Sequence, residues 1–462
     1  MKKAISVLLS ALMLCGCLFA FGAGAAQGSS DFVPTFRFIV SSDTHVRDDS
    51  DVTANRIGKM LALGYEAAGS DPDYNKLDAV LICGDLTNNG TTTQFDKFWA
   101  AVSGAKKDET RFLGVVAKNH DGYTMSRSDM RAYYENLTGN EADFHVVLGG
   151  YHFIGISASE NGAVHYSLSQ LRWLQQELTA ATSQAPDRPV FVMHHEHNRD
   201  TVYGSSSYDG WGVTYFKAIL RQFPQVVDFS GHSHYPLNDP RSVWQGRYTC
   251  VGTGAIYYSE FTVSGVRTYH PADSDATATC WIAELNAEND LRLTGMDVEA
   301  GKPLCEYVLK NPAKSSNREF TPAKLEAASC APAFASDAAL SAGTDYGVCT
   351  VTAPPAQSTD GMPVVLYRAK AMSRFGTVAA QTWTLPCYYR AVEPEDITLT
   401  LEGLAAGTYT VRVTAENAYG KASDPIEITV TVEGDSALVN FPTRIRLFFE
   451  DLIHFLHQLL GI

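Results

Sequence analysis

Short runs of apolar and β-branched residues alternate with amphipathic segments between residues 36 and 284. Runs of this kind, bounded by polar or turn-forming residues, indicate buried strands. Between them, Ser169–Thr182 has Leu171, Leu174 and Leu178 at the spacing of one helical face. Alternating strands and helices are typical of a layered α/β domain. The predicted strands are Phe36–Ser41, Ala79–Cys83, Phe112–Ala117, His152–Ile156, Val190–Met193 and Val226–Phe229.

The pattern changes in the last third of the chain. Residues 301–344 are rich in Ala, Ser, Pro and Lys and have no clear period, so we predict a linker or a segment that covers the core. Residues 345–433 contain strand-like runs without helices. Tyr409 and Val411, for example, alternate with polar residues, as in a strand with one buried face. We therefore predict an α/β core at 33–300 and a separate all-β domain.

The amino terminus has the pattern of a secretory signal. Two lysines precede an apolar run from Ala4 to Phe21, and small residues follow up to residue 26. We predict that residues 1–26 are removed and that the protein is secreted or lies at the surface of a bacterial cell. The stretch Leu14–Cys17 loosely resembles a lipoprotein processing box, which is the less favoured alternative because the apolar run continues beyond it.

The carboxyl-terminal tail, residues 434–462, is predicted to form an amphipathic helix. It is too short and too charged to span a bilayer. Docking on its own protein or self-association is the simpler interpretation, and association with a membrane surface or the cell wall is the alternative. The apolar face consists of Phe448, Leu452, Phe455, Leu456 and Leu459.

The length and net charge of the chain limit the classes of function that are possible. A chain of 462 residues is long enough for two domains and a sizeable core. The formal net charge is −15, and removal of Lys2 and Lys3 with the signal makes it −17. A strongly acidic protein repels phosphate backbones, so we expect no nucleic-acid scaffold as a partner. Small phosphorylated molecules remain possible substrates.

Seven cysteines remain after signal removal. An exported protein permits disulfides among them, with one left unpaired. No CxxC spacing occurs, which argues against a cysteine-based zinc site. The seven are Cys83, Cys250, Cys280, Cys305, Cys330, Cys349 and Cys387.

Polar motifs follow five of the predicted strands. In open α/β sheets, ligands bind at the carboxyl ends of the strands, where these motifs lie. Taken singly each motif is common: an Asp-x-His pair is a turn or an ion pair in most chains, and paired histidines are often exposed. Their order and their placement at strand ends make coincidence improbable. The motifs are Asp43-Thr44-His45, Gly84-Asp85, Asn119-His120-Asp121, His194-His195 and His232-Ser233-His234.

These residue types suit a pair of metal ions. Carboxylate oxygens and imidazoles together favour Fe, Mn or Zn. Asp85 has two oxygens and can bridge two cations, while Gly84 lets the chain turn tightly before it. Two cations about 3.5–4 Å apart can hold one hydroxide as a nucleophile and neutralise phosphoryl oxygens.

The order of the motifs resembles that of the calcineurin-like metallophosphoesterases over about 250 residues. The resemblance implies a four-layer αββα core. It also implies two sets of metal ligands that share Asp85. After the strand Val190–Met193 we favour His194 as the ligand because it comes first after the strand, with His195 as the alternative. The implied ligands are Asp43, His45, Asp85 and His234 for one metal, and Asp85, Asn119, His194 and His232 for the other.

The same resemblance assigns a catalytic role to His120, which would protonate the leaving oxygen. Asp121 is expected to orient its imidazole and to keep it cationic. Two positions depart from the family pattern. Lys118 stands where the family usually has glycine and could add a cation near the phosphate. The motif after Val190–Met193 lacks the proline that commonly follows its histidine and has Glu196 and His197 instead. His197 is expected to be an exposed loop residue, with substrate binding as the alternative. His195 and Lys118 are the other candidate substrate contacts.

Two further features are weaker. The aromatics Tyr235, Trp244, Tyr257 and Tyr258 surround the last motif and are candidates for a pocket wall, although such residues are more often core or rim. Residues 401–420 resemble the second half of a fibronectin type III domain, with Tyr409 as its corner tyrosine and Leu404 in its core.

The sequence therefore predicts an exported, two-metal hydrolase of small phosphate esters, either diesters or monoesters. The alternative is a surface-binding protein with a degenerate phosphoesterase core. The presence of every expected ligand argues against the alternative.

Overall fold

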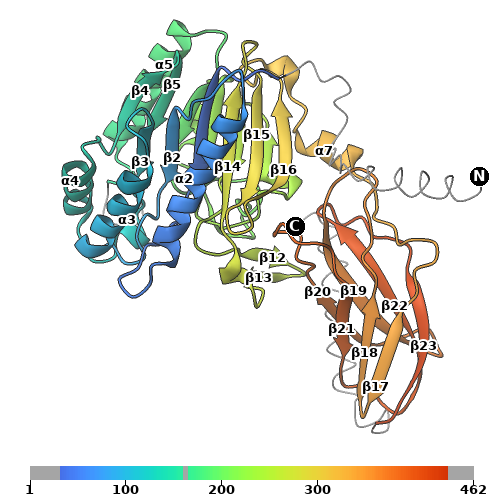
Figure 1. Cartoon of the computed structure of the whole chain (residues 1–462). Coiled ribbons are helices and arrows are strands. Elements are labelled where there is room, and N and C mark those ends of the chain that lie inside the picture. The colour runs from blue at the N-terminus through green and yellow to red at the C-terminus, as the bar shows by residue number, and fades with distance from the viewer. Residues whose placement is uncertain (1–31, 160–164, 435–462) are drawn as a thin grey trace, which may run out of the picture.

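The computed structural model describes residues 32–159 and 165–434. The predicted signal at residues 1–26 and all but the first residue of the tail lie outside the described residues. Within the described part, no helix is both long and apolar enough to cross a membrane. The chain forms an α/β core with a smaller β-sandwich beside it (Figure 1).

The first sheet of the core combines parallel and antiparallel strands in the order β16-β15-β14-β1-β2-β3. Strand β1 pairs in parallel with β2, and β2 with β3, so the carboxyl ends of these three strands meet at one edge. On its other side β1 pairs antiparallel with β14. The strands are β1 (Phe36–Ser41), β2 (Ala79–Cys83), β3 (Arg111–Val115), β14 (Thr279–Leu285), β15 (Leu291–Asp297) and β16 (Lys302–Leu309).

The second sheet has the order β10-β11-β9-β6-β5-β4. Strands β5, β6, β9 and β11 run parallel, while β4 and β10 close the two edges antiparallel. The strands are β4 (Phe144–Leu148), β5 (Tyr151–Gly155), β6 (Val190–Met193), β9 (Val226–Ser230), β10 (Val243–Gln245) and β11 (Thr249–Gly252).

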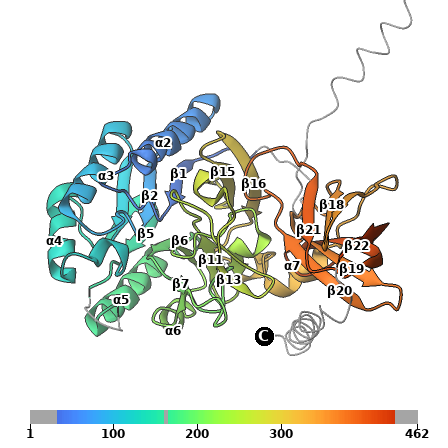
Figure 2. The same cartoon turned by 90° about the horizontal axis from the view of Figure 1, so that it is seen from below.

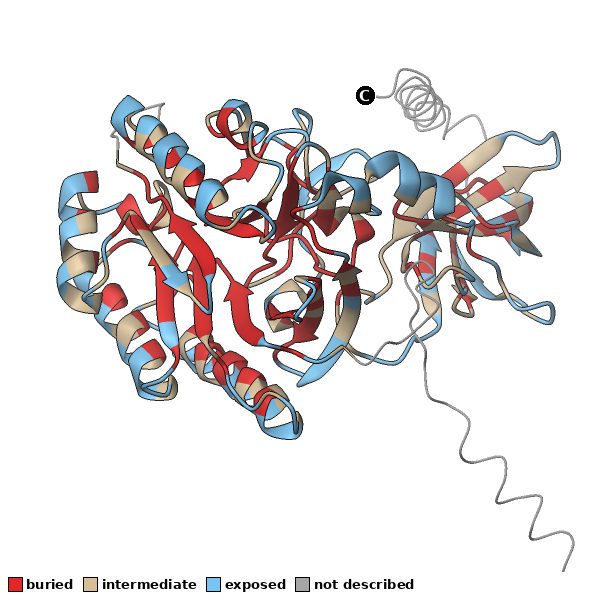
Figure 3. Ribbon diagram, turned by 90° about the horizontal axis from the view of Figure 1, so that it is seen from above, coloured by how far each residue is buried: buried red, intermediate tan, exposed pale blue. Residues whose placement is uncertain are grey.

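Phe38 marks the centre of the layer between the two sheets. Its ring lies 5.5 Å from Phe153, 5.1 Å from Phe191 and 6.1 Å from Phe229, all on the opposite sheet. The central strands are buried on both faces because helices cover the outer ones, which is why these strands are largely apolar (Figure 3). Helices α2, α3 and α4 flank the first sheet, and α5 and α6 flank the second (Figure 2). They are α2 (Val52–Ser70), α3 (Thr92–Ala105), α4 (Arg127–Thr138), α5 (Leu168–Gln184) and α6 (Lys217–Leu220).

The predicted αββα order of layers is therefore confirmed. Strands β1, β2 and β6 begin and end where the sequence indicated, and β3, β5 and β9 differ by one or two residues at their ends. The predicted helix is α5, which begins with a capping box. The Ser167 side chain accepts from the Gln170 backbone amide, and the Gln170 side chain accepts from the Ser167 backbone amide.

The prediction for residues 301–344 was partly wrong. Strand β16 continues the first sheet to Leu309, and its residues Tyr307 and Leu309 are buried between the two sheets. The strand was missed because it carries Pro303 and charged residues. Both are tolerated on an edge strand, where one row of N–H groups needs no partner. A short helix, α7 (Pro322–Ala328), follows before the second domain.

The second domain is a sandwich of a three-stranded and a four-stranded sheet. Leu404 and Tyr409 are buried in its core, and the Tyr409 hydroxyl donates to the Ala405 carbonyl at 2.8 Å, tying the strand to the preceding corner. The more specific resemblance to fibronectin type III stays a prediction. The strands are β17 (Ser341–Asp345), β18 (Val348–Ala353), β19 (Val364–Ser373), β20 (Val378–Thr384), β21 (Ile397–Leu401), β22 (Gly407–Asn417) and β23 (Ile426–Val432).

All seven cysteines of the described residues are free thiols. Cys83, Cys250, Cys280 and Cys349 are buried, and burial raises the pKa of each thiol. They act as small core residues, and the disulfides that export would permit do not form here.

Candidate metal centre

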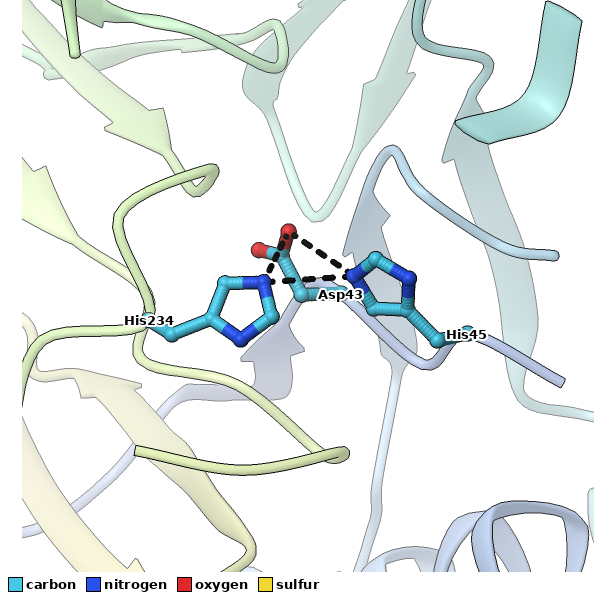
Figure 4. Close-up of side chains that lie close together, drawn as sticks. All are labelled: Asp43, His45 and His234. Atoms are coloured by element: carbon cyan, nitrogen blue, oxygen red, sulfur yellow. Dashed lines mark hydrogen bonds and ion pairs between the residues drawn. The ribbon is translucent and has the colours of Figure 1, made fainter. Parts of the chain in front are cut away.

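Three side chains from two sheets face one another at the first position. Asp43 and His45 follow β1, and His234 follows β9. The Nε2 atom of His234 lies 3.0 Å from Oδ1 of Asp43, and the Nε2 atoms of the two histidines are 3.2 Å apart (Figure 4). The third distance, from Nε2 of His45 to Oδ1 of Asp43, is 3.6 Å. Two imidazoles and a carboxylate directed at one point form a ligand set for a cation.

A second group lies next to the first and contains Asp85, which also approaches His45 of the first group. The Oδ2 atom of Asp85 is 3.1 Å from Nε2 of His195 and 3.8 Å from Nε2 of His45. Nε2 of His195 is 3.0 Å from Nδ1 of His232, which completes the group. Asp85 thus reaches both groups, as the sequence predicted for a bridging carboxylate.

Asn119 also belongs to this second group. Its Nδ2 atom lies 3.2 Å from Oδ2 of Asp85 and 3.4 Å from Nδ1 of His232, while its Oδ1 atom is buried without a hydrogen-bond partner among the described residues. A half turn of the carboxamide exchanges the two atoms and presents the oxygen, a suitable metal ligand, to the same position.

Backbone strain is concentrated in these loops. Nine residues other than glycine have a positive φ in the described part of the chain, and five of them are candidate ligands. A non-glycine residue in this region costs roughly 1–3 kcal/mol and persists only where the surroundings enforce it. The strained ligands are Asp43 (φ 52°), His45 (φ 41°), Asp85 (φ 51°), His232 (φ 75°) and His234 (φ 56°).

The orientation of the histidines fits metal binding. His195 donates from Nδ1 to the Cys83 carbonyl at 2.9 Å, and His234 donates from Nδ1 to the Tyr258 carbonyl at 3.2 Å. Each contact leaves the Nε2 lone pair directed at the cluster, which is how backbone carbonyls fix metal-bound histidines. Within the described part of the chain, Oδ1 of Asp43 and Oδ1 of Asp85 are buried without a hydrogen-bond donor, so both are available as ligands. The donor set therefore fits metal ions.

The electrostatics point the same way. Burial acts to raise the pKa of Asp43, but His234 and His195 outweigh it and hold the pKa of that carboxyl well below its usual range. Burial acts to lower the pKa of His195, but Asp85 and Asp43 outweigh it and raise that pKa well above its ordinary value. Buried negative charge here demands a positive partner. A proton on His195 meets part of this demand, and a divalent cation would meet it more fully.

The preference for His194 over His195 was wrong. His194 points away from the cluster, and its Nε2 atom pairs with Oδ1 of the buried Asp228 at 2.9 Å. Successive side chains leave a strand on opposite faces, so His194 continues the outer face of β6 and His195 the face toward the other sheet. The ring of His194 accordingly packs against Phe216, 4.4 Å away, beneath α6.

His120 is placed as predicted, but Asp121 is not. The ring of His120 meets that of His45 edge to face at 4.2 Å, and its Nδ1 atom lies 2.8 Å from the Asn88 carbonyl. This backbone carbonyl, rather than Asp121, orients the imidazole. Asp121 instead accepts from the Thr87 amide and hydroxyl and from the Ala117 amide, which holds the ligand loop together. Burial, with a contribution from Asp85, raises the pKa of Asp121 to about 6.

Lys118 contacts a buried polar chain beside the second group. Its Nζ atom is 3.1 Å from Nε2 of His165, and Nδ1 of His165 is 2.5 Å from a carboxylate oxygen of Glu196. Tyr166 donates to the other oxygen of Glu196 at 2.9 Å. The lysine is half-buried and held next to Asn119. His165 and Tyr166 were missed because they stand in no motif and lie far from Lys118 in the sequence.

The expectation that His197 is exposed was wrong. It is buried, with Nδ1 2.9 Å from the Ser230 hydroxyl and Nε2 2.7 Å from the Ser233 hydroxyl. Burial, aided by nearby His232, lowers the pKa of His197 to about 3, so it is neutral. It ties the β6 loop to the β9 loop, and both of its ring nitrogens are engaged by serine hydroxyls.

The four aromatic candidates divide into two pairs. Tyr257 and Tyr258 are half-buried and lie against the ligands: their rings are 5.3 Å from His45 and 4.2 Å from His234, respectively. Tyr235 is buried against Tyr203, and Trp244 packs on Tyr248. Trp211, which the sequence did not indicate, meets the ring of His232 edge to face at 5.0 Å.

Comparison with known proteins identifies this arrangement. Residues 36–236 match the family model described as calcineurin-like phosphoesterase. They form a calcineurin-like phosphoesterase domain. All the candidate ligands lie within the matched residues, and the resemblance inferred from the motifs is confirmed.

A curated relative is 27% identical over 160 residues: the probable glycerophosphodiester phosphodiesterase GpdQ of Arcobacter nitrofigilis. The match covers 33% of this chain and 54% of the relative, so the chain spans about half the length of the curated protein it matches. Two solved structures are also similar. GAP50 of Plasmodium has a TM-score of 0.39 at 13% identity and covers 59% of this chain and 87% of its own. Purple acid phosphatase PPD1 of yellow lupin (Lupinus luteus) has a TM-score of 0.41 at 14% identity, with 59% and 53% covered.

Proposed function

We propose that the chain is an exported phosphoesterase that works with two metal ions. The observation that carries the proposal is the position of Asp85, whose Oδ2 atom lies within 4 Å of a histidine from each ligand group. A carboxylate shared in this way supports two adjacent cations rather than one. Export is supported by the signal pattern at residues 1–26.

The proposed ligands are Asp43, His45 and His234 for one ion, Asn119, His195 and His232 for the other, and Asp85 for both. Their mixture of oxygen and imidazole donors favours Fe, Mn or Zn. Two bound ions would supply Lewis acidity and positive charge at the phosphoryl group.

The remaining groups orient the substrate and handle a proton. With Nδ1 held by the Asn88 carbonyl, His120 presents Nε2 toward the centre, where the protonated ring can donate to the leaving oxygen. Lys118 is held beside Asn119 by His165 and is placed to contact a phosphate oxygen.

We infer a phosphodiester as the first substrate class to examine, because the curated relative bears the name of a glycerophosphodiester phosphodiesterase. Monoesters need the same chemistry at phosphorus and differ in the pocket wall, so both classes belong in the test.

The test is a panel of phosphodiesters and phosphomonoesters assayed with Mn, Fe, Zn and Ca, with metal content measured in the same samples. We expect turnover only with metal bound, and about two ions per chain at full activity. Full-length protein that binds metal but hydrolyses no ester would refute the proposal. Protein that takes up no Fe, Mn or Zn would favour the alternative of a surface-binding protein with a degenerate core.

A further inference from the structure

One segment connects the candidate metal centre to the β-sandwich. Residues 253–277, here called the bridging segment, join β11 to β14. Its amides donate to the ligand loop: the Tyr257 N–H reaches the Asp43 carbonyl at 3.1 Å. It also accepts from the His234 side chain through the Tyr258 carbonyl, and the Glu260 N–H donates to the His234 carbonyl at 3.2 Å. The position of the bridging segment therefore affects the positions of two ligands, Asp43 and His234.

The same segment forms one wall beside the first ligand group. Tyr257 and Tyr258 stack beside His45 and His234, and both tyrosines remain partly exposed. A partly exposed aromatic ring next to a phosphoryl site is placed to contact the alcohol part of an ester.

Beyond Tyr258 the bridging segment continues as a two-stranded hairpin, β12 (Phe261–Val263) and β13 (Val266–Tyr269). An isolated two-stranded hairpin is marginally stable in water. Ser264 and Thr268 in addition have positive φ values of 50° and 53°, which other contacts must enforce. The hairpin therefore depends on the surface against which it packs.

The hairpin packs on two surfaces. The core supplies one, where the Tyr203 hydroxyl donates to the Thr262 carbonyl at 2.7 Å and the Tyr208 hydroxyl to the Gly265 carbonyl at 2.9 Å. The β-sandwich, toward which the hairpin projects (Figure 1), supplies the other. Asp273, after the hairpin, accepts from the Tyr389 hydroxyl at 2.5 Å and from Arg390 at 2.8 Å. Phe261 packs edge-on against Tyr389 at 4.9 Å, and Tyr389 is only 2% exposed. At the same end of the hairpin, Tyr269, which pairs with Phe261, packs on Trp383 at 5.1 Å.

Other contacts hold the sandwich to the core on both sides of the hairpin. The Tyr388 carbonyl accepts from Asn238 at 2.6 Å, and the Ala391 N–H donates to Asp297 at 3.0 Å. The stretch from Trp383 to Ala391 is thus fixed to the core and presents Tyr389 to the bridging segment.

We propose that the β-sandwich is a positioning element of the active site: through Tyr389 and Arg390 it holds the bridging segment, and with it the Tyr257–Tyr258 wall. Neither Tyr389 nor Arg390 contacts a ligand, so neither is a catalytic residue. This role rests on the proposed phosphoesterase function, because it concerns where the alcohol part of the ester lies.

The test compares wild type with the full-length, metal-loaded variant Tyr389→Ala/Arg390→Gln. The matched control, Tyr346→Ala/Arg412→Gln, removes the same residue types from the sandwich, at an exposed turn and at a pair with Glu427. For bis(4-nitrophenyl) phosphate we expect KM to rise about tenfold in the first variant, since small displacements of a substrate contact have effects of this size or larger. Metal content, and turnover at saturation, should stay as in the control.

Hydrogen exchange of the bridging segment supplies a readout that does not need activity. We expect its amides to exchange at least about tenfold faster in the Tyr389→Ala/Arg390→Gln variant and not in the control. Exchange and KM equal to those of the control would overturn the positioning role. Wild type without turnover would refute the proposed function, whereas the exchange comparison would still test the contact. If the double variant unfolds, Tyr389→Phe, which removes only the hydroxyl, should show a smaller rise in exchange.

Discussion

Substitution of the two adjacent histidines after β6 should have opposite consequences. His195 faces Asp85 and His232, whereas His194 pairs with Asp228 in the layer beneath α6. We therefore expect His195→Ala to remove metal while the fold remains, and His194→Ala to destabilise the fold while the metal remains.

The size of the His194 effect follows from its surroundings. Both His194 and Asp228 are completely buried, and removing one member of a buried pair costs about 3–5 kcal/mol. Asp228 keeps the Asn198 amide at 2.7 Å and the Cys250 thiol at 3.6 Å, which places the cost near the lower end, about 3 kcal/mol. In a domain of this size that lowers Tm by roughly 6–12 °C.

The size of the His195 effect is set by ligand loss. Removing a group that merely supports a metal ligand costs 10–100-fold in affinity, so loss of the ligand itself should cost at least ~100-fold. Metal affinity is measured by isothermal titration calorimetry, and stability of the fold by thermal unfolding in the presence of a chelator. Retention of wild-type metal affinity by His195→Ala, combined with metal loss in a well-folded His194→Ala protein, would refute this assignment.

Three further predictions follow from the same geometry. Asp85→Asn should lower the occupancy of both metal positions and reduce turnover at least ~100-fold; a variant that keeps both ions contradicts the shared role. His120→Ala should keep its metal and lose ~10²–10⁴-fold in kcat, with a smaller loss for esters whose leaving group needs no proton; equal losses for all esters would argue against an acid. Burial acts to lower the pKa of His195, but Asp85 and Asp43 outweigh it and raise that pKa well above its ordinary value. Metal must therefore displace a proton below that pKa, so affinity should rise with pH, up to tenfold per unit, and calorimetry in two buffers should detect proton release.

The sequence predicted the parts of the centre that depend on strand ends alone. Asp43, His45 and Asp85 follow parallel strands whose apolar runs end abruptly, and parallel strands bring their carboxyl ends to one edge. The strands were recognisable because helices and a second sheet bury both faces, leaving continuous apolar runs. Fold and ligand order therefore followed from local patterns.

The errors arose where the face of a strand had to be known. The run Val190–Met193 is apolar at every position, so its sequence does not tell which residues face the other sheet. In the structure Phe191 and Met193 face it, and His195 continues that face. For the same reason the sequence could not show that His197 turns inward to two serine hydroxyls.

Contacts between segments that are distant in the sequence could not be predicted either. The Asn88 carbonyl that orients His120 and the His165 ring that meets Lys118 come from loops with no motif of their own. Backbone carbonyls carry no sequence signal at all, since every residue has one. Asp121 was assigned to His120 because they are adjacent, yet adjacent residues on a tight turn point in different directions.

The strained ligands explain why the domain needs so rigid a frame. With five ligands at positive φ, a cost of roughly 1–3 kcal/mol each amounts to a sum comparable with the whole stability of a domain. Apolar burial between the two sheets must offset it. Bound cations would offset it further, because they bind the folded arrangement and not the unfolded chain. The backbone at Asp43 and His234 is also held by the bridging segment, and the β-sandwich in turn holds that segment. A change in the sandwich can therefore reach the ligand loops without any contact with the ligands themselves.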